Sequence, residues 1–456
     1  MAAQVHRRMI WTGEKRHEMR ERARNAILAA TARRCGANRV REIFKEGSVV
    51  ILLGTGGVGK TTIAASLGLA AASKRFDTAV ITVDPARRLR DALGLERLSS
   101  RPTRLDASRL QAAGLDPSMK LSAMVLDVKH AWDMLVERFV QSPPGRRRVL
   151  ENPFYRSLSG QFAGSDAYAA LAQLYDLHSE GRFAVQIVDT PPAAHAFEFL
   201  EAPAHLVRLL DSRAARWLFM PYGSAGKGPF SLIGKAAGFV VGELERFAGL
   251  RVLTSLSEFF GAAAGAADAI SARFHKTEAL LRSPSVHFIL VTTAEEDRLR
   301  EARDLIGRMK DEGLRLSGIV LNRFIDERTF NALMTAPRKV PGHMREIAAL
   351  RAVAASELAR DGRLAALISF FEEYDAYHRG AVERAVRFAR ELPKSVKLAI
   401  APDIEFGVRD LNALARVGAT LIDAPDGRKF LDNAAVAFAP PAALGRQTGR
   451  AKRAAG

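Results

Sequence analysis

Residues 54–61 have the types and spacing that suit the binding of nucleotide phosphates. They read Gly-Thr-Gly-Gly-Val-Gly-Lys-Thr and match G-x-x-x-x-G-K-[ST] at every fixed position. Glycines permit a tight turn whose backbone N–H groups point at phosphate oxygens, and the dipole of a following helix adds to the attraction. In such a loop the lysine reaches the β- and γ-phosphates and the last hydroxyl binds Mg²⁺. The predicted nucleotide-binding residues are Gly54, Thr55, Gly56, Gly57, Val58, Gly59, Lys60, Thr61 and Thr62.

The sequence on either side of this loop favours the same interpretation. An apolar run at 49–53 predicts a strand that ends at the loop, and residues 60–72 predict the helix that follows it. The alternative is a glycine-rich turn that binds nothing, but motif and context agree. Two other glycine- and lysine-containing stretches, at 223–228 and 228–236, lack a hydroxyl residue after the lysine. We therefore predict one nucleotide site per chain.

Two aspartates end other strand-like runs. Asp84 follows the run at 78–83, and Asp189 follows the run at 184–188. Side chains at the carboxyl ends of parallel strands lie on the ligand edge of a sheet. Asp84 is placed there either to orient or deprotonate an attacking water or to cap a helix that begins near Pro85. Asp189 has the pattern of an aspartate that holds Mg²⁺ through water or through the loop threonine. The catalytic candidates are Lys60, Asp84 and Asp189, and the magnesium candidates are Thr61 and Asp189.

The strand-like runs alternate with long Ala- and Leu-rich stretches that read as helices. This alternation predicts an α/β fold, with a mostly parallel, doubly wound sheet covered on both faces. Further strands are predicted at 288–291, 318–321 and 396–400. The stretch 204–281 is helix-prone throughout and predicts a helical insertion or subdomain.

These elements suggest a division of the chain into three parts. Residues 1–46 form a basic extension, mobile or helical, and residues 47–436 form the nucleotide-binding domain. Residues 437–456 form a basic, disordered tail rich in Ala, Pro and Arg.

Composition narrows the classes of function. The chain has 456 residues, 48% of them hydrophobic, a net charge of +18 and one cysteine, Cys35. One cysteine excludes a disulfide framework and a cysteine-rich zinc site within the chain. No apolar run reaches the roughly 20 residues that cross a bilayer, and no signal peptide is evident, so we expect a cytoplasmic protein. The charge either attracts nucleic acid or anionic lipid or comes from arginines spread over solvated faces, and we favour the second.

Taken in order over about residues 47–414, these motifs resemble the ArsA-type ATPases. That P-loop family includes arsenical-pump ATPases and the targeting factors for tail-anchored membrane proteins. Residues 54–62 are similar to its loop G-K-G-G-V-G-K-T-[ST] except at one position. Residues 83–86, Val-Asp-Pro-Ala, resemble its first switch, T-D-P-A, which implies that Asp84 is the hydrolytic aspartate. Residues 189–195, Asp-Thr-Pro-Pro-Ala-Ala-His, resemble its second switch, D-T-A-P-T-G-H.

Two shorter matches concern the base of the nucleotide. Asn322 follows the strand predicted at 318–321, where the resembled family has an asparagine that contacts adenine. Residues 401–403, Ala-Pro-Asp, follow the strand at 396–400 and resemble the segment that closes over the base. The resemblance therefore implies that Asn322 and Pro402 contact the nucleotide.

The chain also departs from the resembled family. The second loop residue is Thr55, where the family has a lysine that reaches the nucleotide of the partner subunit across a dimer. This implies either slow hydrolysis or a substitute cation, for which Arg87 and Arg88 are the candidates. The chain lacks the zinc-binding C-x-x-C of the targeting factors and the three thiols that bind arsenite or antimonite. We therefore expect no bound zinc and no thiol-bound metalloid.

The resemblance implies an ATPase whose Mg–ATP cycle drives a conformational switch in a homodimer, in the cytoplasm or peripheral to the membrane. An apolar protein client would bind the helical stretch 204–281, although for any one of its apolar residues we favour packing in the core. Two alternatives remain open. One is a partitioning-type scaffold that uses ATP to bind DNA or another polyanion, which the composition does not favour. The other is a nucleotide-binding protein that hydrolyses little.

Overall fold

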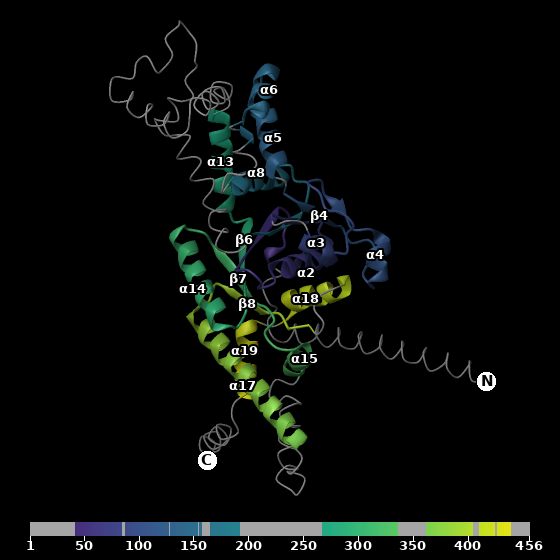
Figure 1. Cartoon of the computed structure of the whole chain (residues 1–456), viewed down its shortest axis with the longest axis vertical. Coiled ribbons are helices and arrows are strands. Elements are labelled where there is room, and N and C mark those ends of the chain that lie inside the picture. Colours follow the sequence, from purple (N-terminus) through teal and green to yellow (C-terminus); the bar gives the residue numbers. More distant parts are fainter. Residues whose placement is uncertain are drawn as a thin grey trace, which may run out of the picture.

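Figure 1 shows a computed structural model of the chain. Several predicted features lie outside the residues that it describes: Asp84 with Pro85 and Ala86, the second-switch residues from Pro192 onward, and most of the stretch 204–281. The structure describes residues 42–83, 87–126, 128–153, 155–156, 165–191, 267–335, 362–404, 410–424 and 426–438.

The described residues form an eight-stranded sheet in the order β3-β4-β2-β5-β1-β6-β7-β8. All neighbouring strands are parallel except β3 and β4, which confirms the predicted α/β fold with a mostly parallel sheet. The short edge pair β3–β4 was not predicted from the sequence. The strands are β1 Ser48–Leu53, β2 Thr78–Thr82, β3 Thr103–Arg104, β4 Leu121–Val125, β5 Val185–Asp189, β6 Val286–Thr292, β7 Leu316–Leu321 and β8 Lys397–Ile400.

The register of the central strands determines which of their residues lie side by side at the carboxyl edge of the sheet. Asp189 of β5 lies opposite Leu52 of β1 on one side and Thr82 of β2 on the other. On the far side of β1, Leu53 lies opposite Leu290 of β6. The carboxyl ends of four parallel strands therefore meet at one edge of the sheet, where the loop after β1 begins.

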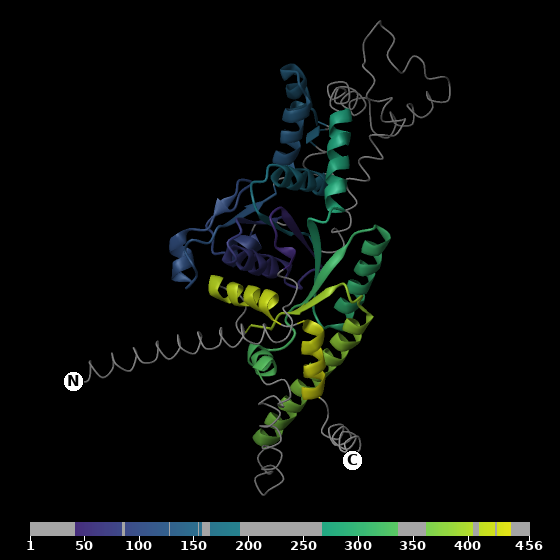
Figure 2. The ribbon, with the colours of Figure 1, turned by 180° about the vertical axis from the view of Figure 1, so that it is seen from behind.

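Helices cover both faces of the sheet, so each face has its own apolar core. One face carries α2 Lys60–Ser73, α3 Arg87–Ala92, α4 Ala107–Ala112 and α18 Leu411–Asp423. The other face carries α8 Ser165–Ser179, α14 Glu296–Asp311, α15 Glu327–Thr335, α17 Gly362–Glu391 and α19 Gly427–Ala437. Figure 2 shows α2 and α18 lying beside one another on the flank away from α14 and α17.

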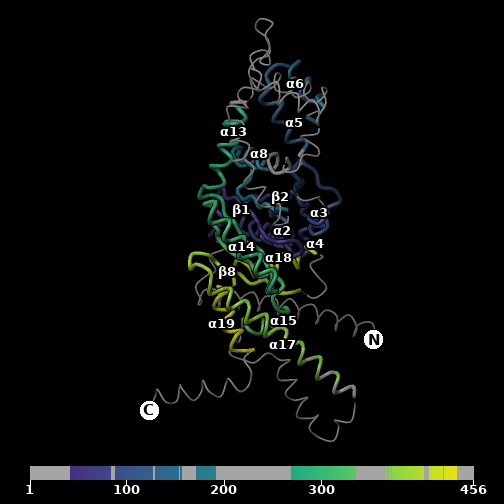
Figure 3. Tube along the Cα trace, turned by 60° about the vertical axis from the view of Figure 1, so that its left-hand side comes forward, coloured from purple at the N-terminus to yellow at the C-terminus, as the bar shows by residue number. Residues whose placement is uncertain are grey.

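A helical lobe extends beyond the sheet at the upper end of Figure 3. It consists of α5 Val128–Phe139, α6 Pro143–Glu151, the helix α8, and α13 Ala267–Leu281, around a small apolar cluster that includes Trp132 and Phe274. The Tyr155 hydroxyl donates a hydrogen bond of 2.8 Å to Asp133, and burial together with this carboxylate raises the pKa of Tyr155 well above its usual range. Buried Arg273 of α13 pairs with Asp176 of α8. Because α8 leads into β5 and α13 leads into β6, the lobe joins the two strands that flank β1.

Core contacts reach both ends of the described chain. Ile43 and Phe44 are buried before β1, and Phe438 is buried after α19. The three-part division of the chain stays a prediction. Within the described ranges no helix is both long and apolar enough to cross a bilayer.

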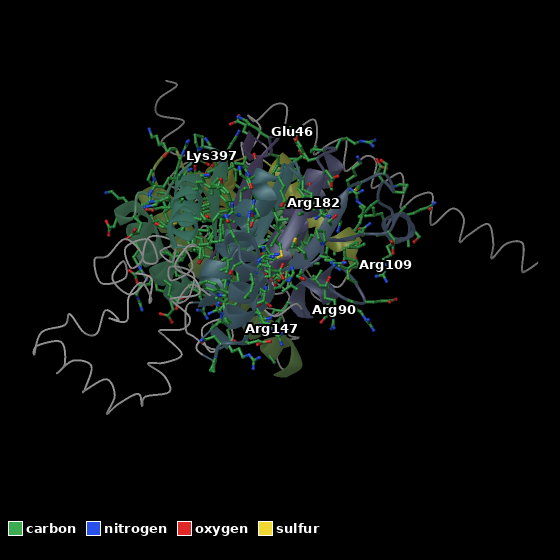
Figure 4. The ribbon with its side chains drawn as sticks, turned by 90° about the horizontal axis from the view of Figure 1, so that it is seen from above. Glu46, Arg90, Arg109, Arg147, Arg182 and Lys397 are labelled. Carbon is green, nitrogen blue, oxygen red and sulfur yellow. The ribbon has the colours of Figure 1, made fainter. Side chains whose placement is uncertain are left out.

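The arginines behind the high net charge are dispersed. Figure 4, viewed from above, labels Arg90 of α3, Arg109 of α4, Arg147 of α6 and Arg182, which precedes β5. Three of them pair with nearby carboxylates: Arg90 with Asp91, Arg109 with Glu96, and Arg147 with Glu151. This distribution is the one expected for arginines on solvated faces.

Candidate nucleotide site

The loop between β1 and α2 has the backbone of a phosphate cradle. Gly54, Gly57 and Gly59 have φ angles of 150°, 82° and 90°, which residues with a Cβ rarely adopt. A Cβ on Gly54 would overlap the carbonyl oxygen of Val291, and one on Gly59 would overlap the side-chain amide of Asn322. Glycine is therefore required at both ends of the loop because strand β6 and the residue after β7 approach it closely.

Lys60 begins α2 at the mouth of this loop. Its side chain is 8% exposed, and its Nζ donates hydrogen bonds to the carbonyl oxygens of Gly54 (2.9 Å) and Thr55 (3.1 Å). No side chain caps the start of α2, and no acidic residue lies in its first turn. The ammonium and the N–H groups of a helix N-terminus therefore face the same opening, which is a favourable place for a phosphate.

Thr61 and Asp189 meet beside the lysine. The Thr61 hydroxyl donates a hydrogen bond of 2.6 Å to Asp189 Oδ2, although the two residues are 128 positions apart. Asp189 is 1% exposed, and the Thr82 hydroxyl donates to the same oxygen at 3.3 Å. Hydroxyl and carboxylate oxygens are the ligands that Mg²⁺ prefers, so these residues fit the ion directly or through water. Sequence reasoning missed Thr82, although its place at the end of β2, two residues before Asp84, was a usable signal.

Asn322 lies against the other side of the loop. Its Nδ2 donates a hydrogen bond of 2.8 Å to the carbonyl oxygen of Val58, and the residue is 6% exposed. Its backbone N–H donates to Thr292 at 2.8 Å, which fixes it at the end of β7. Pro402 is buried just beyond β8, the neighbouring strand. Asn322 therefore contacts the loop itself, whereas contacts from Asn322 and Pro402 to a base stay predictions.

A family model described as anion-transporting ATPase, ArsA_ATPase, matches residues 48–343, well over half of the chain. The chain belongs to this family. Its match confirms the predicted resemblance and begins at β1, the strand that leads into the phosphate loop. This anion-transporting ATPase family member is accordingly a P-loop ATPase.

Individual relatives agree with this placement. The chain is 24% identical over 284 residues to "ATPase GET3" of Malassezia globosa, an alignment that covers 60% of this chain and 71% of the relative. It is 30% identical over 166 residues to "ATPase ASNA1 homolog" of Babesia bovis, covering 36% and 40%. It is 27% identical over 174 residues to "Putative arsenical pump-driving ATPase" of Halobacterium salinarum, covering 37% and 25%.

Some predicted residues of this ATPase are not brought to the loop in the described structure. Asp84 lies outside the described residues, as does the side chain of Arg87, while Arg88 is exposed on α3. Thr55 is partly buried, and its Oγ1 has no hydrogen-bond partner among the described residues. The nucleotide contacts expected for all of residues 54–62 stay predictions.

Proposed function

We propose that this ATPase binds ATP together with Mg²⁺ at residues 54–62 and hydrolyses it as a homodimer whose shape changes with the state of the nucleotide. The contact between Thr61 and Asp189 is the observation that carries the proposal. It joins the hydroxyl expected to bind Mg²⁺ to the carboxylate expected to support it, directly beside Lys60. This arrangement of hydroxyl, carboxylate and lysine around a glycine loop suits a magnesium-bound triphosphate.

Each residue of the site has a distinct task in the proposed reaction. Lys60 neutralises charge on the β- and γ-phosphates, and the loop N–H groups hold the phosphate oxygens in place. Asp189 orients the Thr61 hydroxyl by accepting a hydrogen bond from it. Bound Mg²⁺ would supply further neutralisation of the phosphate charge. Asp84, which stands two residues after the end of β2 in the sequence, orients the attacking water, as the resemblance implies.

The proposed shape change starts at the residues after Asp189. The Thr190 hydroxyl donates a hydrogen bond of 2.5 Å to the carbonyl oxygen of Leu52, so the first residue after β5 is tied to the strand that ends at the loop. The chain then continues through Pro191 toward the segment that resembles the second switch. A movement of Asp189 on hydrolysis would therefore be transmitted along the backbone to that segment.

A protein client on the helical part of the chain is the second component of the proposal. The lobe formed by α5, α6, α8 and α13 is joined to β5 and β6. Its α13 forms the C-terminal end of the stretch 204–281, on which the apolar client site was predicted. We propose that an apolar segment of a client protein binds this region in one nucleotide state.

Substitution of Lys60 tests the nucleotide site. Lys60→Ala is expected to abolish phosphate release and to weaken ATP binding strongly, because the loop then has no side-chain cation. The matched control is Lys310→Ala, which removes an exposed lysine at the end of α14 and is expected to leave both unchanged. Phosphate release with excess Mg–ATP and titration calorimetry provide the measurements. Near-normal turnover by Lys60→Ala would overturn the site.

A further inference from the structure

A cavity of about 250 Å³ lies beside the phosphate loop, on the side of the sheet that carries α14 and α17. The tip of the loop, Gly56 and Gly57, forms one wall. Thr293 and Glu295, at the start of α14, form a second wall, and Arg384 of α17 a third. The residues around it that bear on the argument are Gly56, Thr293, Glu295, Arg298, Arg323 and Arg384.

Arg323 reaches this cavity from an unusual backbone conformation. Its φ angle is 51°, in the left-handed region that residues other than glycine and asparagine rarely adopt. Both neighbours are buried and fixed: Asn322 donates to Thr292, and the Phe324 N–H donates to Ala401 at 3.2 Å. Strained backbone of this kind persists where the surroundings impose it, and it concentrates at functional sites. Arg323 lines the same cavity as Gly56 and Gly57 of the loop.

Arg323 differs from the other arginines of the cavity in having no partner among the residues that the structure describes. Arg298 pairs with Glu301 at 3.0 Å, and the Arg384 Nε donates to the Ala294 carbonyl oxygen at 2.8 Å. Arg323 makes no hydrogen bond or ion pair with any residue that the structure describes, although Glu295 lines the same cavity. Arg323 is exposed, so its guanidinium can bind an anion without first breaking a contact with a described residue.

Two further features of the cavity favour an anion. Thr293 is 8% exposed, and its Oγ1 has no hydrogen-bond partner among the described residues. The helix α14 begins at the cavity wall, and Glu295 at its N-cap position makes no side-chain capping hydrogen bond, although Glu296 and Asp297 add negative charge to the first turn. A buried hydroxyl without a partner is costly unless a ligand satisfies it. The carboxylates of Glu295 and Asp403 also line the cavity, but the arginines outnumber them.

We propose that Arg323 binds a phosphate oxygen of the nucleotide on the Gly56–Gly57 side of the loop, with the Thr293 hydroxyl as a second donor. This inference rests on the proposed ATP site and adds a residue to it. Arg323 supplies a positive charge beside a loop whose second residue is the neutral Thr55. The phosphate belongs either to the nucleotide of the same chain or to that of a second copy, and the chemistry of the contact is the same in both cases.

Arg323→Asn separates a role in phosphate binding from a role in shaping the turn. Asparagine tolerates the left-handed conformation but has no charge. We expect kcat/KM for Mg–ATP to fall about tenfold or more, because a hydrogen bond to a charged group is lost. The thermal unfolding midpoint should stay the same or rise. Arg323→Lys should recover part of the loss, and Thr293→Val should lower kcat/KM with little change in stability.

The control variant is Arg300→Ala, which removes an exposed arginine of α14 that pairs only with Asp297. It should retain wild-type kcat/KM. Wild-type kcat/KM in Arg323→Asn would overturn the inference, and if Lys60→Ala were inactive in the same assay, the proposed function would still stand. A wild-type chain that releases no phosphate would instead overturn the proposed function.

Mixing two variants identifies which nucleotide Arg323 contacts. Lys60→Ala chains retain Arg323 but bind ATP poorly, whereas Arg323→Asn chains retain the ATP site. Turnover in an equimolar mixture well above the sum of the separate variants would assign the contact to the nucleotide of a second copy. Turnover equal to that sum would assign it to the nucleotide of the same chain.

Discussion

Asp84 and Asp189 are both aspartates at the ends of parallel strands, yet they are expected to act differently. Asp189 is almost fully buried and accepts hydrogen bonds from Thr61 and Thr82 through one oxygen. These contacts suit Asp189 to support a metal ion bound beside Thr61. Asp84 follows β2 in the sequence, and β2 is the neighbour of β5, the strand that carries Asp189. The resemblance implies that Asp84 orients the attacking water.

Replacing each aspartate by asparagine tests this division of roles. Asp84→Asn should bind Mg–ATP with near-wild-type affinity but hydrolyse it about a hundredfold more slowly or worse, because a positioned general base contributes that much. Asp189→Asn should first raise the magnesium concentration needed for half-maximal activity. Nucleotide titration and magnesium-dependent phosphate release distinguish them. An equal loss of ATP affinity in both variants would contradict the assigned roles.

At the scale of elements, the site depends on how closely α18 approaches α2. A Cβ on Gly418 of α18 would overlap the carbonyl oxygen of Ser66 in α2. The side chains of α2 are buried from Ile63 to Ala72, so this helix is enclosed by the sheet and by its neighbours. Because α2 also carries Lys60 and Thr61, its position against α18 affects the position of both.

Gly418→Ala should therefore destabilise the fold by about 1–3 kcal/mol, since an extra methyl group in a close helix contact forces the backbones apart. The matched control is Gly307→Ala in α14, where an added Cβ meets no atom within 4 Å. It should be neutral or stabilise by up to about 1 kcal/mol, because alanine favours a helix more than glycine does. Urea unfolding of both variants provides the measurement, and equal stabilities would contradict the close contact.

A second contact between elements links the residues after β7 to α17. Asp326 accepts a hydrogen bond from the Thr329 N–H at 2.9 Å and one from the Tyr374 hydroxyl at 3.2 Å. Burial alone would raise the pKa of Asp326, but the hydrogen bonds from Thr329 and Tyr374, with nearby His378, lower it below its ordinary value. Burial and Asp326 together raise the pKa of Tyr374 to about 12.

The sign of the pKa shift of Asp326 predicts how its contribution to stability depends on pH. A carboxyl whose pKa is lower in the folded state stabilises that state above its unfolded pKa of about 3.9, and this contribution disappears as the pH falls through the folded pKa. Asp326→Asn should therefore lower the free energy of unfolding clearly at about pH 7 and much less at about pH 3. Urea unfolding at both pH values measures this, and a pH-independent difference would contradict it.

At the scale of the whole molecule, the proposed dimer brings two loops into one assembly. No group of three His, Cys, Asp or Glu residues that could hold a metal ion occurs within the described ranges. Elemental analysis of the purified protein is expected to find no zinc.

Nucleotide should control the association of two copies. We expect light scattering to give a larger fraction of dimer with Mg–ATP than without nucleotide. The reason is that the phosphate loops of both copies would then contact the negatively charged phosphates. Lys60→Ala, which binds ATP poorly, should not respond. A mass that stays that of a monomer with Mg–ATP would contradict the proposed dimer. A mass that is that of a dimer in every condition would support a dimer but contradict its control by nucleotide.

The sequence alone determined the phosphate loop, because that feature is local. Eight consecutive residues contain the glycines, the lysine and the hydroxyl, and the apolar run before them predicts β1 without reference to the rest of the chain. The alternation of apolar and helix-prone runs likewise predicted the α/β class. The short strand β4 was missed because its five residues, Leu-Ser-Ala-Met-Val, include a serine and stand next to an antiparallel edge strand of two residues.

Only the tertiary structure decided which distant residues meet the loop. Strand β1 lies between β5 and β6, and this order, which no local pattern specifies, brings Asp189 to Thr61. Asn322 reaches Val58 across 264 positions in the same way, and the next residue, Arg323, lines the cavity beside the loop. The reason is that a side-chain contact depends on the register of several strands at once, whereas a turn depends on the φ angles that its own residues permit.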